Sequence, residues 1–187
     1  MHQIINRLQR KFKRHKIKWF LSRKNIKFDG IPSFSGDWPD INNEGKISIG
    51  ENCSFMSFRL RQLITVKKNA ELAIGYNLFL NDGVNICSTQ SIRIGHDVKI
   101  GDMTYIYDTD FHEICPGKPT KHMPVSIGNN VWIGAKSIIL PGSVIGDHCV
   151  IAAGSIVTGE IPAKSLAAGT PARVIKALNI PDGWIRK

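Results

Sequence analysis

Between residues 127 and 157 an aliphatic side chain recurs at every sixth position. An α-helix has a period of 3.6 residues, so a spacing of six would scatter these side chains around a helix. Six residues of nearly extended chain that end in a corner instead return each aliphatic to the same inward position of a coil. Such a coil buries its inner face only by stacking on its neighbours. The spacing therefore predicts a parallel β-helix, with inward residues Ile127, Ile133, Ile139, Ile145, Ile151 and Val157.

The same register continues upstream with interruptions. Weaker traces of it precede residue 74, and two clear runs follow, separated by a step of eight residues instead of six. We therefore assign residues 29–165 to the β-helix, with an arm at residues 1–28 and a tail at residues 166–187. The upstream inward positions are Ile49, Phe55, Val66, Leu72, Ile74, Leu80, Ile86, Ile94, Ile100 and Ile106.

The repeat breaks down between Ile106 and Ile127, where the spacing exceeds three hexads and the composition changes. Residues 107–126 are expected to form a loop that leaves the coil. Long loops on a rigid scaffold often carry functional residues. This loop contains Asp108, Asp110, His112 and His122.

Positive charge is concentrated in the arm. The chain has 25 Lys and Arg against 15 Asp and Glu, and ten of the cations precede the first acid, Asp29. Ile4, Leu8 and Phe12 have helical spacing, which predicts a basic amphipathic helix. Two interpretations stay open: peripheral contact with an anionic membrane, or packing on the end of the β-helix. Basic segments can also bind nucleic acid instead of a membrane, but we do not expect nucleic acid as a partner.

The sequence argues against membrane insertion and secretion. No stretch approaches the roughly 20 apolar residues that span a bilayer, and cations interrupt every apolar run of the arm, unlike in a signal peptide. The four cysteines have no metal-ligand or disulfide spacing. Cys53 and Cys149 fall in short-residue slots of the repeat, so core packing explains them. We expect a cytoplasmic protein, at the inner face of the membrane if the arm binds lipid.

Four segments, at residues 127–134, 138–145, 152–158 and 167–176, carry the motifs Ile-Gly-Asn-Asn-Val-Trp-Ile-Gly, Ile-Ile-Leu-Pro-Gly-Ser-Val-Ile, Ala-Ala-Gly-Ser-Ile-Val-Thr and Ala-Ala-Gly-Thr-Pro-Ala-Arg-Val-Ile-Lys. With the hexads, they resemble the hexapeptide-repeat acyltransferases, in particular the galactoside, maltose and polysaccharide O-acetyltransferases, over residues 47–176. The resemblance implies an all-β fold, a left-handed parallel β-helix. It also implies a homotrimer that binds acetyl-CoA between subunits and needs no metal.

Acetyl transfer to a sugar hydroxyl requires a base, and histidine titrates near neutrality. Of six histidines, the resemblance identifies His112 as catalytic. In an extended chain Asp110 would project to the same side as His112, where its carboxylate could orient the imidazole or bind a sugar hydroxyl. Alternatively, Asp110 belongs to a turn in which it caps its own backbone. The resemblance also places Asn81 against the acceptor. The alternative role for this residue is structural, in a stack of asparagines that stabilises a coil corner.

The resemblance further identifies six coenzyme contacts. Small residues let main-chain groups approach the pantetheine amides. A tryptophan lines the cleft or packs between subunits. Two cations, which we expect on one face of a short helix after Pro171, contact the phosphates of the coenzyme. The chain departs from its relatives at Gly159, where they carry a lysine. The contacts are Ala135, Ala153, Thr158, Trp132, Arg173 and Lys176.

Three functions are compatible with the fold. We favour an O-acetyltransferase acting on a surface polysaccharide or its precursor. The second is an N-acetyltransferase of a nucleotide-linked amino sugar, which in some cases carries an N-terminal Gly-rich βαβ unit absent from this sequence. The third is a carbonic anhydrase of the γ class, whose paired histidines lie five apart, whereas His112 and His122 are ten apart.

Overall fold

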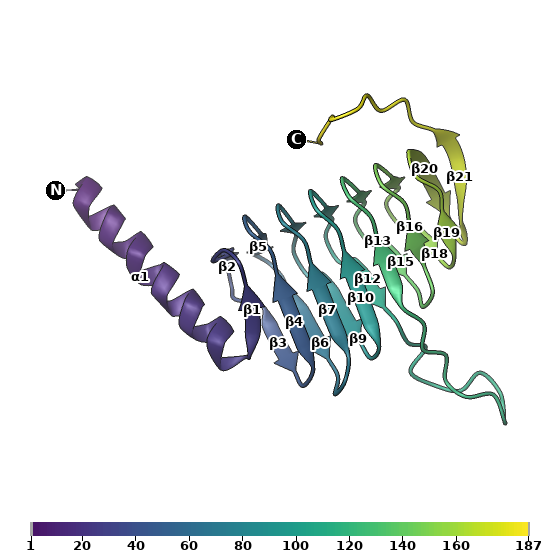
Figure 1. Ribbon diagram of the computed structural model, residues 1–187, viewed down its shortest axis with the longest axis horizontal. Coiled ribbons are helices and arrows are strands. Elements are labelled where there is room, and N and C mark those ends of the chain that lie inside the picture. Colours follow the sequence, from purple (N-terminus) through teal and green to yellow (C-terminus); the bar gives the residue numbers. More distant parts are fainter. Residues whose placement is uncertain (1, 187) are drawn as a thin grey trace.

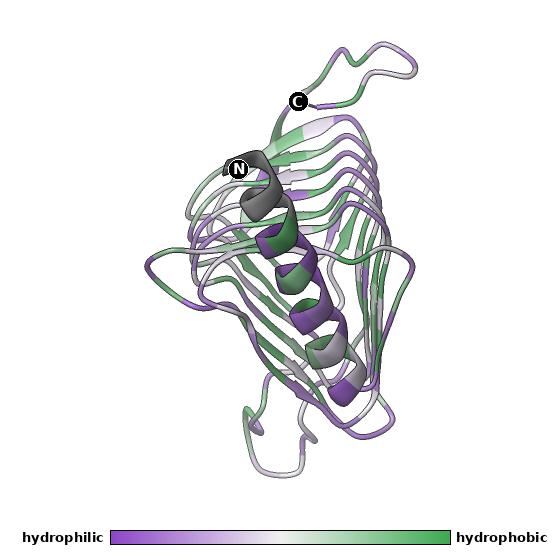
Figure 2. Cartoon of the chain, turned by 90° about the vertical axis from the view of Figure 1, so that its left-hand side faces the viewer, coloured by the Kyte–Doolittle hydropathy of each residue, from purple (hydrophilic) through white to green (hydrophobic). Residues whose placement is uncertain are grey.

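The structure is a computed structural model that describes residues 2–186, with the side chains of residues 2–7 outside the description. Over this range the chain forms a β-solenoid preceded by α1 (His2–Arg23) (Figure 1). Seen along its axis, the solenoid has a triangular section (Figure 2). Three sheets form its sides, which we name A, B and C in the order in which the chain visits them.

Successive coils add one strand to each sheet, except that the described part of the last coil adds none to sheet C and β21 joins sheet B as an antiparallel strand. Sheet A contains β1 (Ile26–Phe28), β4 (Lys46–Ile49), β7 (Glu71–Ile74), β10 (Ser91–Ile94), β13 (Val125–Ile127), β16 (Val144–Ile145) and β19 (Glu160–Ile161). Sheet B contains β2 (Ser33–Gly36), β5 (Ser54–Ser57), β8 (Phe79–Leu80), β11 (Lys99–Ile100), β14 (Trp132–Ile133), β17 (Val150–Ile151), β20 (Ser165–Gly169) and β21 (Ala172–Ala177). Sheet C contains β3 (Asp40–Asn43), β6 (Leu63–Val66), β9 (Asn85–Ser88), β12 (Tyr105–Tyr107), β15 (Ile138–Ile139) and β18 (Ile156–Val157).

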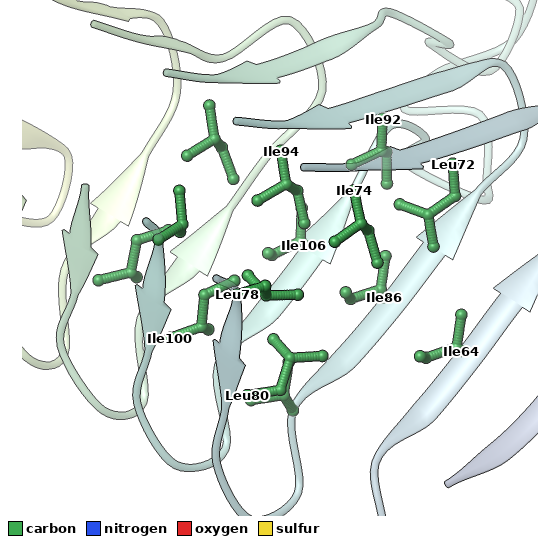
Figure 3. Packing of buried hydrophobic residues seen from close by; sticks show 14 of the residues in the cluster. Ile64, Leu72, Ile74, Leu78, Leu80, Ile86, Ile92, Ile94, Ile100 and Ile106 are labelled. Carbon is green, nitrogen blue, oxygen red and sulfur yellow. The ribbon is translucent and has the colours of Figure 1, made fainter. Parts of the chain in front are cut away.

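The aliphatic hexads form three ladders inside the solenoid, as predicted. In sheet B, for example, Leu80 pairs with Ile100, Ile100 with Ile133, and Ile133 with Ile151. These side chains are fully buried, and Figure 3 shows the ladders converging on the interior. Full burial of such a side chain contributes roughly 1.5–3 kcal/mol. Cys53 and Cys149 also lie in this core, as expected.

Corners between the sheets require special backbone conformations. At the A–B corners the chain turns through a residue with positive φ, and these include Asn52, Asn77, Asp97 and Asn130. Asn and Asp tolerate this left-handed region better than other residues with a side chain. At the B–C corners the successive coils approach so closely that a Cβ on Gly134 would lie 2.5 Å from the Ala153 nitrogen. Corner composition therefore allows the coils to stack.

The two halves of α1 differ in their surroundings. Ile17 and Leu21 are buried, and Phe20 packs edge-on against Phe34 and Trp38 at the open end of the solenoid. The predicted packing interpretation is thus confirmed for this end of α1. Residues 8–16 are exposed and extend beyond the coils (Figure 1). Within the described residues, no helix combines the length and apolar character needed to cross a bilayer.

The prediction of a helix after Pro171 is wrong. The segment forms β21 instead, which pairs antiparallel with β20. The last parallel strand of sheet B would otherwise leave a row of unpaired backbone groups, and a returning strand satisfies them. Val174 and Ile175 are β-branched residues that favour extended structure. Tertiary context therefore decides the conformation of this segment.

We predict that Gly134→Ala lowers the free energy of unfolding by about 1–3 kcal/mol, because the new methyl group must displace the backbone of the next coil. Gly159→Ala is the matched control. A Cβ there meets no atom within 4 Å and the residue has no positive φ, so we expect stability unchanged or raised by up to about 1 kcal/mol. Thermal melts at matched protein concentration measure both; equal melting temperatures for the two variants would contradict the stacking argument.

Candidate active site

The excursion loop is anchored by a buried carboxylate at its base. Asp108 follows β12 and is fully buried. Its two oxygens accept hydrogen bonds from the backbone amides of Thr89 and Gln90, at 2.7 and 2.9 Å, and from the hydroxyls of Ser88 and Thr89. Asp108 therefore joins the loop to the corner of the preceding coil, and this structural role was not assigned from the sequence.

His112 lies on the exposed part of the loop, which projects from the C–A edge of the solenoid (Figure 1). Its backbone amide donates to the carbonyl of Asp110 at 2.8 Å. The chain is not extended between them, because Phe111 adopts a positive φ of 62°. The geometric reason for placing Asp110 and His112 on one side is therefore wrong. Within the described residues no hydrogen bond joins the Asp110 carboxylate to the imidazole of His112.

Two other side chains near the loop can be distinguished from His112. His122 Nδ1 lies 2.9 Å from the hydroxyl of Thr89, so its ring belongs to the anchored base of the loop. Tyr107 packs edge-on against Phe111, with ring centroids 5.3 Å apart. Burial, followed by the neighbouring Tyr105 and Cys87, raises the pKa of Tyr107 to about 12. Its phenol is therefore protonated at neutral pH and is no candidate base, whereas the imidazole of His112 lies on the exposed part of the loop.

Three predicted residues share the B–C edge. Because Leu80, Ile100, Ile133 and Ile151 are in register, the residues that follow each of them form a row along this edge. Asn81 belongs to this row together with Gly134 and Ala152, and Ala135 and Ala153 lie one position further along the same corners. The Asn81 Oδ1 accepts from the Asp82 amide at 3.0 Å. Its amide nitrogen makes no hydrogen bond within the described residues, so it is available to an acceptor hydroxyl.

Arg173 and Lys176 do share a face, but for a reason other than the one expected. They pair with Ala168 and Leu166 of β20, and a register shift between Leu166 and Ala167 inserts one extra residue in β21. Cross-strand partners lie on the same face of a sheet. In a regular strand, two residues three positions apart point to opposite faces, but the extra residue of a β-bulge brings Arg173 and Lys176 back to the same face. Both cations therefore project from the outer face of sheet B, with Arg173 near the B–C edge.

Trp132 lies on the same outer face, in register with Val150 and Leu166. The residue is 47% exposed. The guanidinium of Arg186 lies 5.9 Å from its ring centroid, and Asn130 holds the tail through the Trp184 carbonyl and the Arg186 amide. The tail thus partly covers Trp132, a contact that the sequence did not indicate.

Thr158 and the excursion loop lie on a different edge from Ala135 and Ala153. Thr158 follows β18, at the C–A edge, five residues after Ala153, and an extended-chain rise puts an upper bound of about 16 Å on their separation. One chain therefore carries the predicted site as two halves. His112 and Thr158 form the first half, whereas Asn81, Ala135, Ala153 and Arg173 form the second.

Sequence reasoning missed two groups on the B–C edge. Lys136 follows Ala135 and is an exposed cation in the left-handed conformation of the corner. Arg59 lies 3.6 Å from Asp82 and 3.7 Å from Asp102, beside Asn81. The backbone amide of Arg59 lowers the pKa of Asp82, which stays ionised. Both groups are charged residues at corner positions of the repeat, and this pattern could have identified them from the sequence.

We predict that Asp108→Asn lowers the free energy of unfolding by about 1–3 kcal/mol, because the new amide group faces a buried N–H donor. The loop base should loosen, so trypsin should cleave faster at Lys118 and Lys121. Asp110→Asn is the control, since the Asp110 carboxylate makes no hydrogen bond within the described residues, and its effect should stay within about 0.5 kcal/mol. Indistinguishable digestion of the two variants would refute the anchoring role.

The bacterial transferase hexapeptide (six repeats) model matches residues 124–159. The chain is 40% identical to the galactoside O-acetyltransferase of Escherichia coli (strain K12), with 60% of this chain and 57% of that protein covered. It is 33% identical to WbbJ of the same strain, named for lipopolysaccharide biosynthesis O-acetyl transfer, with 74% and 76% covered. The match thus spans less than two thirds of the first relative and about three quarters of the second.

Two solved structures share the fold at 26% identity. AntD, an N-acyltransferase from Bacillus cereus in complex with dTDP and 3-hydroxybutyryl-CoA, superposes with a TM-score of 0.73 over 87% of this chain and 88% of its own. The Vibrio cholerae acetyltransferase VCA0836, complexed with acetyl coenzyme A, gives 0.57 over 79% and 73%. With the stacked hexads and the extensive match to WbbJ, these findings show that the chain belongs to the hexapeptide-repeat acetyltransferase family.

Proposed function

We propose that the protein is an acetyl-CoA-dependent O-acetyltransferase that acts on a sugar hydroxyl of a surface polysaccharide or its precursor. The observation that carries this proposal is an exposed histidine on an anchored loop, combined with a solenoid edge of small residues that ends in two cations. Relatives named for galactoside and lipopolysaccharide O-acetylation support the acceptor class.

His112 acts as the general base in this proposal. Its neutral imidazole takes the proton of the acceptor hydroxyl as the oxygen attacks the thioester carbonyl. The carbon–sulfur bond then breaks, and the coenzyme leaves as a thiol after the imidazolium returns the proton to sulfur. Asn81 donates from its free amide nitrogen to the acceptor, and Asp110 remains our second acceptor-binding residue. No redox or metal step is part of this scheme.

The active site is completed by a second copy of the chain. His112 and Thr158 lie on the C–A side, and the small-residue wall lies on the B–C edge, one side of the triangular coil away. A neighbour that sets its C–A edge against this B–C edge unites the two halves. Repeating that heterologous contact closes a ring, for which we propose the homotrimer. The left hand of the coil likewise remains an expectation from the family resemblance.

The coenzyme runs along the B–C edge in this arrangement. Five strand steps separate β8 from β21, so Asn81 and Arg173 lie about 24 Å apart along the edge. Ala135 and Ala153 line the pantetheine between them. Arg173 and Lys176 meet the phosphates, and Trp132 borders the cleft from β14, the strand that precedes Ala135.

N-acyl transfer to a nucleotide-linked amino sugar is the second candidate. It is supported by the likeness to AntD, which covers 87% of this chain and has dTDP bound. The same edges serve either acceptor, because an amine and a hydroxyl both lose a proton to the base. A panel of sugars and amino sugars, scored by thiol release from acetyl-CoA, distinguishes the two.

We predict that His112→Ala lowers turnover by roughly 10²–10⁴-fold, the usual contribution of a general base, with little change in acetyl-CoA affinity. His15→Ala, which changes an exposed histidine of α1 whose Nδ1 lies 2.8 Å from the Lys11 carbonyl oxygen, should keep wild-type turnover. Steady-state assays of thiol release measure both. Near-normal turnover of the His112 variant would remove this residue from the mechanism.

Subunit mixing tests whether two copies share the site. Ala153→Trp blocks the coenzyme wall, and His112→Ala removes the base, so each variant alone should be inactive. After unfolding and refolding together, every mixed trimer holds one intact interface, and random mixing should restore about a quarter of wild-type activity. If mixed oligomers form but activity does not return, the site lies within one chain.

We predict that Arg173→Ala weakens CoA binding by about 1.5–3 kcal/mol, the contribution of a charge-assisted hydrogen bond. Arg93→Ala is the control, because Arg93 is an exposed arginine on sheet A, and it should leave the dissociation constant unchanged. Titration calorimetry with CoA provides both constants. Equal affinities for the Arg173 variant and the wild type would show that this guanidinium does not contact the phosphates.

A further inference from the structure

Helix α1 carries two apolar faces that point in opposite directions. Ile17 and Leu21 are buried against the solenoid, whereas Leu8, Phe12 and Trp19 are 61%, 64% and 61% exposed. At about 100° per residue, the latter three lie within roughly 40° of one another. The direction of this exposed stripe is opposite to that of the buried pair. We call residues 8, 12 and 19 the outer stripe.

The orientation of the outer stripe is fixed by the packing of the other face. Phe20 meets Phe34 and Trp38 edge-on, with ring centroids 6.1 and 5.2 Å apart. A rotation of α1 that turned the outer stripe toward the coils would expose Ile17 and Leu21. The N-terminal part of α1 also extends past the end of the solenoid (Figure 1), and hydrophobic and hydrophilic positions alternate around the helix (Figure 2). The stripe therefore faces solvent.

Cations surround the outer stripe. The Nζ of Lys16 lies 4.6 Å from the Phe12 ring centroid, and the guanidinium of Arg23 lies 4.9 Å from that of Trp19. The helix contains no acidic residue, and within the described residues none of its cations forms an ion pair with a carboxylate. Its exposed cations are Arg10, Lys11, Lys13, Arg14, Lys16, Lys18 and Arg23.

We propose that the outer stripe binds the surface of an anionic lipid bilayer. Aromatic and leucine side chains enter the boundary between headgroups and acyl chains, while the flanking cations attract anionic headgroups. The stripe spans twelve residues, eleven helical steps or roughly 16 Å, parallel to the surface. The solenoid, attached through the opposite face of α1, then stands on the aqueous side.

Charge and chemistry favour lipid over other occupants. A second copy of α1 would bring seven exposed cations against seven more, without an acid between them. Nucleic acid would satisfy the cations through its phosphates, but those phosphates offer no apolar partner for Leu8. An anionic bilayer supplies both negative charge and an apolar layer.

Vesicle sedimentation tests the outer stripe. The full chain should sediment with vesicles of equal parts phosphatidylglycerol and phosphatidylcholine at low salt, and should stay in solution with phosphatidylcholine alone. The double variant Phe12→Glu/Trp19→Glu should reduce partitioning at least about tenfold. Phe58→Glu, which alters an aromatic side chain that is 65% exposed on the solenoid, is the matched control and should bind as the wild type does. Unchanged melting temperatures would show that the variants fold.

A charge series completes the test. Each of Lys11→Gln, Lys16→Gln and Lys18→Gln should weaken partitioning about fivefold, whereas Lys67→Gln on the solenoid should have no effect. Binding of the double stripe variant at the wild-type level would overturn the proposal, as would equal binding of the wild type to both vesicle types. So would stripe-dependent self-association, or tighter binding to a DNA duplex than to anionic vesicles.

Discussion

The stacking of one coil on the next is the interaction on which the rest of this structure depends. No coil encloses a core alone, because each of its three sides is a single short strand, such as β7, which buries only Leu72 and Ile74. Ladders such as Leu80, Ile100, Ile133 and Ile151 become a core only when neighbouring backbones stay in register. Close approach at the B–C corners, where Gly134 meets Ala153, makes small residues a requirement there. That requirement also leaves an edge that a flexible ligand with amide groups can follow closely.

A solenoid has two open ends, and this chain closes them differently. At the first end α1 covers the aromatic cluster of Phe34 and Trp38 with Phe20. At the other end β21 pairs with β20 and satisfies its free edge, as terminal elements of repeat proteins must. Both end elements carry cations outward. The stable interior of the molecule is thus separated from the surfaces that we propose to meet the coenzyme and the bilayer.

The inward ladders, the excursion loop and the helical arm could be predicted because each depends on local spacing in the sequence. The period of six specifies which face is inside, and its interruption locates the loop. The tail could not be predicted in this way, since the conformation of residues 172–177 depends on the unpaired edge of β20. The Asp110 argument failed for a local reason: a positive φ at Phe111 turns the chain. Asp108 was ambiguous because its partners are on the previous coil, at Ser88, Thr89 and Gln90.

The division of the candidate site over two edges follows from the same geometry. A triangular coil presents three corners, and any two of them are separated by the width of a sheet. Residues at the same corner of different coils lie along one edge, as Asn81, Ala135 and Ala153 do, while a residue at the next corner, such as Thr158, cannot join them within one chain. Binding that uses both corners therefore needs contact between two solenoids. Under our proposal, the edge that makes close stacking within a chain possible is also the edge at which a second chain completes the chemistry.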